Sequence, residues 1–365
     1  MSSIVSLMKR RSEIVFLYAC STFVALLISA IIVEAVGANW SDVWNSLLDG
    51  SLRKPGRWGK TLGSAVPMAM VAVGTIISTK VGLINIGQEG QMLVGAAFAA
   101  YVGANMPGSG PIVISLIIIG GFVGGAFWSG LAGALRYWRN VPEVLTTLLL
   151  VTVAANLVGY GLKNTWLLLD PDAAFGNRTL VSKQLDPDSR LPRIEIFGNN
   201  FSLSVILALL IIVLTTWVLS QTIIGFKLNV VGQNQRVGQR FGISEVKQGF
   251  MAMCASGGFA GLAGAMMLAS GDFAKYRLVT GFTVNLGWTG LLVALVAREK
   301  VMAIIPVALI FASLRTGSSF LAATGVERRV TDVVQGLLVL ALLVPPAILF
   351  IRDRRRTLAQ VESRT

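Results

Sequence analysis

Long runs of apolar residues, most close to 20 residues in length, follow one another along the chain and are separated by short polar or charged stretches. A helix needs about 20 mostly apolar residues to cross the hydrocarbon core of a bilayer. The pattern therefore predicts membrane-spanning helices rather than the amphipathic helices of a soluble domain. Ten spans are predicted, at residues 14–33, 62–79, 86–102, 112–135, 144–161, 203–224, 248–270, 286–297, 301–314 and 333–351.

Two of these runs, 286–297 and 301–314, are shorter than the others, so a strict count would give eight or nine helices. Arg298 and Lys300 lie between them and indicate a turn at the membrane surface. We therefore predict an all-α, polytopic membrane protein with about ten helices in a single transmembrane domain over residues 1–365. Its parts are first-half spans in 14–161, an external loop over 163–202 and second-half spans in 203–351.

Composition supports this prediction and excludes an ordinary soluble enzyme. Hydrophobic residues make up 54% of the chain and charged residues only 13%, whereas soluble domains carry about 25% charged residues. The net charge of +13 could indicate nucleic-acid binding. In a chain this apolar, a Lys/Arg excess is more typical of membrane orientation and of contact with anionic lipid headgroups. We predict membrane lipid, and no nucleic acid, as a partner.

Basic clusters set the predicted orientation. Residues 9–11 and 352–356 are rich in Lys and Arg, and the positive-inside bias places both termini in the cytoplasm. With ten spans the short basic connections at 136–139 and 298–300 fall on the same side. The basic stretch 53–60 falls outside and is the exception. The predicted location is the plasma membrane, crossed many times.

The residues that usually carry catalysis or bind metals are scarce. The chain contains no histidine, which removes the commonest general base and metal ligand. Cys20 and Cys254 lie inside apolar runs, so we expect two buried, reduced thiols rather than a disulfide or a metal site. No Gly-x-x-x-x-Gly-Lys-Ser/Thr phosphate loop occurs, so this chain cannot itself hydrolyse ATP by that route. We predict no enzyme activity, no metal site and no cofactor bound by this chain.

Two segments on the predicted external side are more than short linkers. Ser41 is a candidate cap for a short helix in which Val43, Trp44, Leu47 and Leu48 share one face, as in a helix lying at the membrane interface. An ordinary loop is an equal alternative there. The segment 163–202 contains three X-Pro pairs and is long enough to form a small external cap.

A six-residue pattern occurs once in each half of the chain. Asn-Ile-Gly-Gln-Glu-Gly at 85–90 recurs as Asn-Leu-Gly-Trp-Thr-Gly at 285–290. Five spans separate the copies, an odd number, so the two halves would have opposite orientation, as in an inverted repeat. Coincidence in a glycine-rich chain is the alternative.

Each copy of this pattern predicts a helix break beside a polar pathway, because glycine weakens helices and asparagine can satisfy freed backbone groups. Glu89 adds an ionisable group within a predicted span, which indicates a functional site. An interfacial anchor near Lys80 is an equal alternative for Glu89. We predict that Asn85, Glu89 and Asn285 line the substrate pathway.

The polar, basic segment 225–247 connects two spans and cannot lie in hydrocarbon. It is the longest internal connection on the predicted cytoplasmic side, so it is the natural docking surface for a soluble partner. The alternative is a charged loop that only sets the orientation of the chain.

These motifs resemble a known family. Residues 82–91, Gly-Leu-Ile-Asn-Ile-Gly-Gln-Glu-Gly-Gln, resemble the GLFNIGxEGQ segment of permease subunits of bacterial ATP-binding-cassette (ABC) importers of the branched-chain amino acid, ribose and nucleoside group. Residues 225–243 resemble that group's coupling loop, which docks on the ATPase, although Gln235 stands where the family often has Pro and Val237-Gly238 where it often has paired Ala. Residues 281–306 also match, with departures at Trp288 and Arg298. The resemblance covers about 62–350.

The resemblance implies a permease domain with a type II ABC importer-like fold, ten helices in two inverted five-helix halves. It implies two cytoplasmic ABC ATPase subunits, which bind the ATP, and an extracytoplasmic substrate-binding (lipo)protein. The long external segment resembles the larger permease of nucleoside importers, which implies pairing with a second, paralogous permease. The residues expected to couple to the ATPase are Gly225, Gly232, Gln233, Asn234, Arg236, Arg240 and Gly242.

The expected solute is a nucleoside or a simple sugar, and a branched-chain amino acid is the alternative within the same family. Two other classes remain open. A secondary transporter driven by an ion gradient would need a buried proton or sodium site, for which the sequence offers mainly Glu89. A membrane scaffold without transport activity would leave the paired Asn/Gly motifs without a role.

Overall fold

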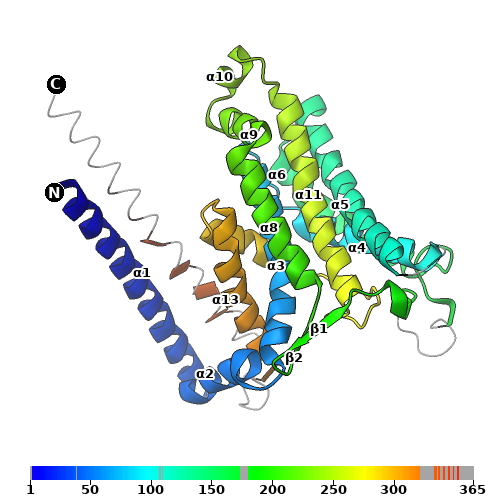
Figure 1. Cartoon of the computed structure of the whole chain (residues 1–365), viewed down its shortest axis with the longest axis horizontal. Helices are drawn as coiled ribbons and strands as arrows, with labels where there is room; N and C mark the ends of the chain where they lie inside the picture. The colour runs from blue at the N-terminus through cyan, green and yellow to red at the C-terminus, as the bar shows by residue number, and fades with distance from the viewer. Residues whose placement is uncertain are drawn as a thin grey trace. The chain divides into compact units, whose positions relative to one another are not determined.

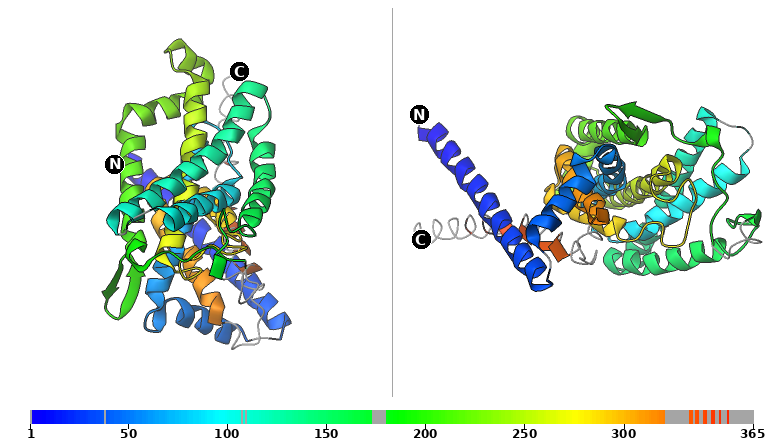
Figure 2. Two further views of the ribbon diagram at one scale, coloured as in Figure 1. Left: turned by 90° about the vertical axis from the view of Figure 1, so that its right-hand side faces the viewer. Right: turned by 90° about the horizontal axis from the view of Figure 1, so that it is seen from below.

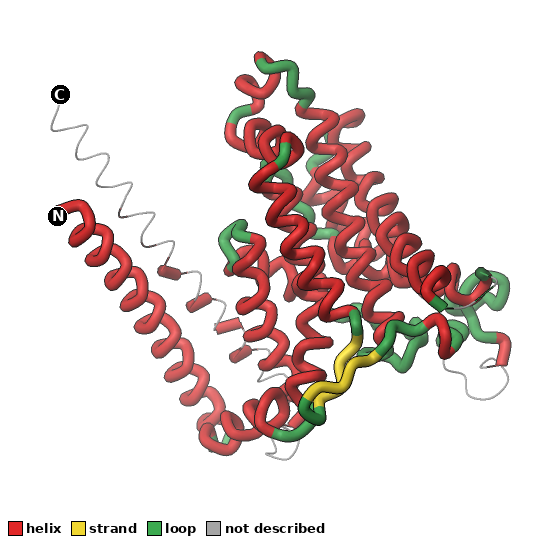
Figure 3. The backbone as a smooth tube through the Cα atoms, in the orientation of Figure 1, coloured by secondary structure: helices red, strands yellow, loops and turns green. Residues whose placement is uncertain are grey.

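The computed structural model describes residues 2–320 except 38, 107, 109 and 173–179, and then 333–334, 336–337, 340–341, 344–345, 348 and 352; of residues 2–15 and 18 it describes the backbone only. Most of the described chain is helical (Figure 3). The chain divides into two compact units, one formed by Met1–Lys54 with Ser313–Thr365 and the other by Pro55–Ala312. Each unit is described by itself below.

The larger unit is a bundle of helices with one short hairpin. Its helices are α3 (Arg57–Thr79), α4 (Gln88–Asn105), α5 (Pro111–Arg139), α6 (Glu143–Gly161), α8 (Ser204–Gln221), α9 (Ile223–Gln233), α10 (Gln235–Arg240), α11 (Glu245–Ser270), α12 (Leu286–Val296) and the first part of α13 (Ile304–Gly317). Single 3-10 turns form at Pro187–Ser189 and Val301–Ala303. An antiparallel hairpin pairs β1 (Arg193–Ile196) with β2 (Asn199–Ser202), which the all-α prediction did not include.

Helices α3 and α11 form the centre of this unit, because most of their residues are buried. Helix α5 lies beside α11 (Figure 1). The two helices approach closely at glycines: a Cβ added at Gly125 or Gly261 would collide with the backbone of the other helix. Small residues allow this close backbone approach between membrane helices. The run 261–265, in which four of the five residues are Gly or Ala, is buried throughout.

The two polar segments of this unit lie at its opposite ends. Helices α9 and α10, in the predicted coupling segment, lie at one end, and the β1–β2 hairpin, in the predicted external segment, lies at the other (Figures 1 and 2). Helix α8 connects the two ends with 18 residues, or roughly 27 Å at 1.5 Å per residue. This length is close to the thickness of the hydrocarbon core.

Six stretches among the described residues are long and apolar enough to cross a membrane. They confirm the second, fourth, fifth, sixth, seventh and ninth predicted spans, and they are Arg57–Thr79, Pro111–Arg139, Glu143–Gly161, Ser204–Gln221, Glu245–Ser270 and Val301–Phe320. A polytopic membrane protein is therefore confirmed.

Other predicted spans differ from the structure. The run predicted at 286–297 forms the 11-residue helix α12, which is roughly 16 Å long and cannot cross a core of about 30 Å alone. As a complete crossing this predicted span is wrong. The run predicted at 86–102 becomes helical only at Gln88 and continues to Asn105. The predicted span 333–351 lies in part outside the described residues.

The smaller unit contains α1 (Ser2–Ala35), α2 (Trp40–Leu48) and a π-helical turn at Asp49–Arg53. The Ala19–Ala35 part of α1 and the stretch Trp40–Arg53 form a bent pair with an angle of 115°. The predicted short helix is confirmed, but its cap is wrong. Asn39 rather than Ser41 caps α2, because the Asn39 Oδ1 accepts a hydrogen bond from the Ser41 backbone N–H at 2.8 Å.

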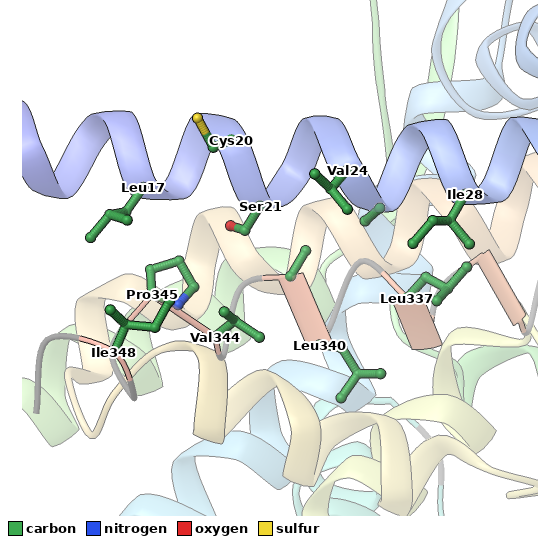
Figure 4. A pocket seen from close by; sticks show the side chains of 12 residues that line it. Leu17, Cys20, Ser21, Val24, Ile28, Leu337, Leu340, Val344, Pro345 and Ile348 are labelled. Atoms are coloured by element: carbon green, nitrogen blue, oxygen red, sulfur yellow. The ribbon is translucent and has the colours of Figure 1, made fainter. Parts of the chain in front are cut away.

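One face of α2 packs inside this smaller unit. Val43 and Leu47 are buried in a cluster with Val33 and Leu314. The unit also holds an apolar cavity of about 440 Å³ between side chains of α1 and those of the stretch 337–348 (Figure 4). Cys20 lies on the wall of this cavity and is exposed, so the prediction that it is buried is wrong.

Candidate functional site

The two copies of the repeated motif meet in the larger unit. The Glu89 carboxylate, in the first turn of α4, accepts a hydrogen bond from the backbone N–H of Gly287 through Oε2 at 2.7 Å. Gly287 lies in the first turn of α12, where backbone N–H groups have no partner within the helix. A carboxylate is favoured there by the helix dipole. Glu89 of the first copy therefore caps the helix that the second copy begins.

This junction lies inside the bundle. A Cβ at Gly287 would collide with the Glu89 backbone, so glycine is required for the close approach of α12 to α4. Three residues further on, a Cβ at Gly290 would collide with the Val71 side chain, near the middle of α3. Helix α12 therefore begins at mid-depth of the bundle.

Asn85 is fully buried just before α4, and its side chain makes four hydrogen bonds. Its Nδ2 donates to Gln91 Oε1 at 2.8 Å and to Ser256 Oγ at 2.9 Å. Its Oδ1 accepts from Gln91 Nε2 at 2.9 Å and from the Gly87 backbone N–H at 3.1 Å. The nitrogen and the oxygen of the Asn85 amide both have hydrogen-bond partners, as is usual for buried polar groups. Asn85 thus ties the break before α4 to α4 itself and to α11.

The start of α4 is also held from two other sides. The Gln88 amide lies 2.5 Å from the Thr75 hydroxyl of α3, and with its nitrogen turned the other way it donates to Val71 O at 2.9 Å. On the α6 side, a Cβ at Gly87 would collide with the carbonyl oxygen of Thr147. Helices α3, α6, α11 and α12 therefore surround this turn.

Asn285 occupies the corresponding place before α12, but its backbone conformation, exposure and hydrogen bonds differ from those of Asn85. Its backbone is left-handed, with φ of 63°, and its side chain does not cap the helix. The residue is exposed. Its carbonyl oxygen accepts from the backbone N–H and the hydroxyl of Thr289, at 3.0 and 2.6 Å. Asparagine adopts the left-handed region more readily than other side chains, which explains its use at this break.

A cavity of about 190 Å³ lies beside the junction. Glu89 borders it, together with Thr280 and Thr283 from the loop before α12 and small and apolar residues of α6. Asn85 and Asn285 are not among its lining residues. Sequence reasoning did not single out the two threonines, although their place just before the second motif copy was a usable signal.

The predicted coupling segment is mostly helical rather than a loop. Asn234 separates α9 from α10 and caps α10, because its Oδ1 accepts from the backbone N–H groups of Arg236 at 3.0 Å and Val237 at 3.2 Å. Gln233, Asn234, Arg236 and Arg240 are exposed. These side chains are therefore available for contact with a partner.

The three predicted glycines of this segment have distinct places. A Cβ at Gly225 would collide with the Leu219 backbone of α8, and one at Gly232 would collide with the carbonyl oxygen of Lys80, next to the end of α3. Gly242 has φ of 71°, a left-handed conformation that favours glycine. Gly232 thus brings α9 directly onto the central helix α3.

Sequence reasoning missed two exposed aromatic residues of the predicted coupling segment. Phe226 and Phe241 are 63% and 77% exposed, in the same segment as the exposed basic residues Arg236 and Arg240. Exposed aromatic and Arg side chains are enriched at protein interfaces. Two phenylalanines in a connection rich in glycine, glutamine and basic residues were the available signal.

The predicted external segment is held on the loop that follows α11. Arg277 pairs with Asp170 and Arg193 pairs with Asp272, both at 2.9 Å. Arg190 lies over the Tyr276 ring at 4.3 Å. Burial alone would lower the pKa of Arg193. Asp272 and Tyr276 raise this pKa by more than burial lowers it, so it lies above its ordinary value. These contacts make the segment a packed part of this end of the unit.

Within the described ranges, no three His, Cys, Asp or Glu side chains lie close enough together to hold a metal ion. The described part of the chain combines six membrane-length stretches with a half-length helix that begins inside the bundle and a cavity at the first turn of that helix. These features are typical of a membrane transport protein. The chain belongs to the family described as branched-chain amino acid transport system / permease component, which matches residues 59–343.

Individual relatives are similar over most of the chain. The guanosine ABC transporter permease protein NupP of Bacillus subtilis (strain 168) is 29% identical over 88% of this chain and 89% of its own length. The glucose ABC transporter permease protein TsgB13 of Haloferax volcanii is 27% identical over 87% of this chain and 84% of its own length. A second Bacillus subtilis protein, the guanosine ABC transporter permease protein NupQ, is 25% identical over 56% of this chain and 64% of its own length.

Proposed function

We propose that this chain is the membrane-spanning permease subunit of an ATP-driven ABC importer that moves a nucleoside or a simple sugar across the plasma membrane. The observation that carries the proposal is the junction at which Glu89 caps α12 beside a cavity of about 190 Å³. Relatives over most of the chain are permeases named for guanosine and for glucose. Both are uncharged solutes rich in hydroxyl groups.

The chemistry of the cavity favours such solutes. A carboxylate accepts hydrogen bonds, and the hydroxyl groups of Thr280 and Thr283 donate and accept them. Among the described residues that line the cavity none is positively charged, so Glu89 could pair with the ammonium group of a free amino acid, but the carboxylate of that amino acid would have no counter-charge. This disfavours a branched-chain amino acid as the solute.

The proposed pathway passes Glu89 and the exposed Asn285. Glu89 lies in the first turn of α4 in the first half, and Asn285 lies just before α12 in the second half. Asn85 is buried in this conformation, and its place along the pathway stays a prediction. The chain would form one permease domain with two inverted halves, in which α12 is a half-length helix rather than a complete span, and both termini would lie in the cytoplasm. Within the larger unit, the opposite placement of the hairpin and of α9–α10 supports the assignment of the segments 163–202 and 225–247 to opposite sides of the membrane.

The proposed partners follow the same orientation. Two ABC ATPases would bind ATP and dock on the segment 225–247, where exposed Phe226, Phe241 and arginines are available. A substrate-binding (lipo)protein would deliver the solute at the end of 163–202. A second permease would complete the transporter, since one Bacillus strain has two guanosine permeases similar to this chain.

The test is transport by the complete assembly in lipid vesicles. The chain, its second permease and the ATPases are reconstituted with ATP sealed inside, and labelled guanosine, glucose and leucine are supplied outside with the binding protein. We expect uptake of guanosine or glucose that requires hydrolysable ATP and persists when ionophores abolish ion gradients. Uptake driven by an ion gradient in vesicles without the ATPases would instead identify a secondary transporter, and leucine uptake alone would refute the proposed solute class.

A further inference from the structure

Helix α12 is bounded at both ends by residues in the left-handed conformation. Asn285 before it has φ of 63°, and Arg298 and Glu299 after it have φ of 51° and 59°. Left-handed backbone is costly for side chains other than glycine and persists only where the surroundings impose it. Sharp turns therefore separate α12 from its neighbours, and its 11 residues form a short rod.

Each end of this rod is held by one charged contact to another element. At its first turn the Glu89 carboxylate binds the Gly287 N–H at 2.7 Å. Beyond its last turn Glu299 Oε2 pairs with Lys80 Nζ at 3.1 Å. Lys80 is the C-cap residue of α3. Between the two ends, Gly290 lies against Val71, so the rod rests on α3 near its middle.

The Lys80 contact is also the place where the predicted coupling segment enters the bundle. A Cβ at Gly232 of α9 would collide with the Lys80 carbonyl oxygen and lie 3.2 Å from Val81 Cα. No side chain separates α9 from this stretch of backbone. A displacement of α9 would therefore move Lys80, and with it the partner of Glu299.

There is space for the end of α12 to respond. A second cavity, of about 230 Å³, is lined by Thr75, Ile76 and Thr79 of α3 and by the last residues of α12 with Arg298 and Glu299. Close-packed interiors resist displacement, whereas this end of the rod borders unfilled volume. The opposite end carries the Gly287 contact to Glu89, at the wall of the first cavity.

We propose that α12 is a lever that transmits movement of α9 to the Glu89 cavity, and that Lys80 and Glu299 are the positioning residues that join the lever to α9. This inference rests on the proposed function, because it takes α9 to be the element that the ATPases move. Neither positioning residue lines the Glu89 cavity. Their loss changes how much solute moves for each ATP hydrolysed.

The experiment uses charge reversal in the complete reconstituted transporter. Lys80→Glu and Glu299→Lys each place like charges together, and the double variant restores an opposite pair. Solute uptake and ATP hydrolysis are measured in the same vesicles. We expect each single variant to lower the solute moved per ATP by about tenfold, within the range of typical coupling energies, while ATP hydrolysis stays within about twofold of wild type. The double variant should recover most of the loss.

Folding and assembly are checked separately. The side chains of Lys80 and Glu299 are 24% and 54% exposed, and exposed ion pairs contribute little to stability, so the variants should retain the ATPases on purification. The matched control is the pair Arg136–Glu143, at 3.3 Å between α5 and α6 of the same unit. Arg136→Glu and Glu143→Arg should leave the solute moved per ATP unchanged.

Three outcomes would overturn the proposal that α12 is a lever. The first is that both single variants move as much solute per ATP as wild type. The second is that the double variant stays uncoupled although the ATPases are bound, and the third is that the Arg136 and Glu143 controls lose as much solute per ATP as the single variants. A wild-type assembly without ATP-dependent uptake is a different result, because it refutes the proposed function itself. The two failures are therefore distinguishable.

Discussion

The two copies of the Asn-apolar-Gly-x-x-Gly motif are alike in sequence and different in construction. In the first copy, Asn85 is fully buried and makes four hydrogen bonds. In the second, Asn285 is exposed, left-handed and does not cap its helix with its side chain. Both copies begin a helix, and the two meet at the Glu89–Gly287 hydrogen bond.

The difference follows from the residues that surround each asparagine. Gln91, which pairs with Asn85, corresponds to Leu291 in the second copy, so Asn285 has no amide partner at that position. Glu89 corresponds to Thr289, whose hydroxyl bonds within its own turn and does not reach the other copy. The shared pattern therefore indicates where a helix begins, whereas the partners decide what its polar side chains do.

The largest effect is expected from Asn85→Leu, which removes four buried hydrogen bonds and leaves the Gln91 amide without this partner. Buried polar groups without partners cost about 1–3 kcal/mol each, so the free energy of unfolding should fall by about 3 kcal/mol. The measurement is thermal unfolding in detergent micelles. Asn285→Leu is the matched variant and should lose less than half as much. Equal losses would show that the two asparagines are equivalent after all.

A smaller loss is expected for Gly287→Ala, because the added methyl group meets the Glu89 backbone. Overpacking of this kind costs about 1–3 kcal/mol, and uptake should fall because α12 is displaced from the cavity. The control is Gly159→Ala in α6, where no described atom outside that helix's own backbone lies within 4 Å of the added carbon. If Gly287→Ala matches this control in unfolding midpoint and uptake, the close approach of α12 to α4 is wrong.

The next prediction concerns the cap between the two copies. Glu89→Ala removes the acceptor for the Gly287 N–H, and loss of a helix cap costs about 1 kcal/mol. Glu89→Gln keeps an oxygen acceptor and loses only the charge, which is worth a few tenths of a kcal/mol at a helix N-terminus. Unfolding in micelles should therefore rank wild type first, then Gln, then Ala. A Gln variant as unstable as the Ala variant would show that charge rather than hydrogen bonding holds α12.

The smallest effect is expected for Asn285→Gly. Glycine adopts φ of 63° without strain, so the free energy of unfolding should stay within about 0.5 kcal/mol of wild type, whereas Asn285→Ala should lose about 1 kcal/mol. Asn85→Gly should be destabilising instead, because glycine removes the side-chain hydrogen bonds of Asn85. An Asn285→Gly variant that unfolds as easily as Asn85→Gly would contradict a purely conformational role for Asn285.

Local features of the fold, such as the membrane spans, were predictable from the sequence. The sequence could not decide which of two nearby polar residues caps a helix. The second, fourth, fifth, sixth, seventh and ninth spans follow from apolar runs long enough to cross a bilayer. The short helix after α1 was also predicted, but Asn39 and Ser41 are both good N-cap residues and lie two positions apart. Only the local backbone path selects between them.

The candidate site was predictable in part. Glu89 was singled out as an ionisable group in a predicted span, and the structure places it at a cavity. The exposed Phe226 and Phe241 were missed because apolar residues beside a span resemble a continuation of it. The run at 286–297 was predicted with nearly the correct length, but it was wrongly taken as a complete span, since an apolar run does not report that its first turn lies inside the bundle.

By itself, the sequence determined the class of protein, most of its membrane spans and the two places where a helix starts after a break. These depend on composition and on spacing over a few residues, which any chain of this sequence carries with it. Only the tertiary structure decided that Glu89 binds Gly287, that Asn85 binds Ser256 and that Gly232 packs on Lys80. Those contacts join residues more than 150 positions apart, and close packing between helices is what brings their atoms within bonding distance.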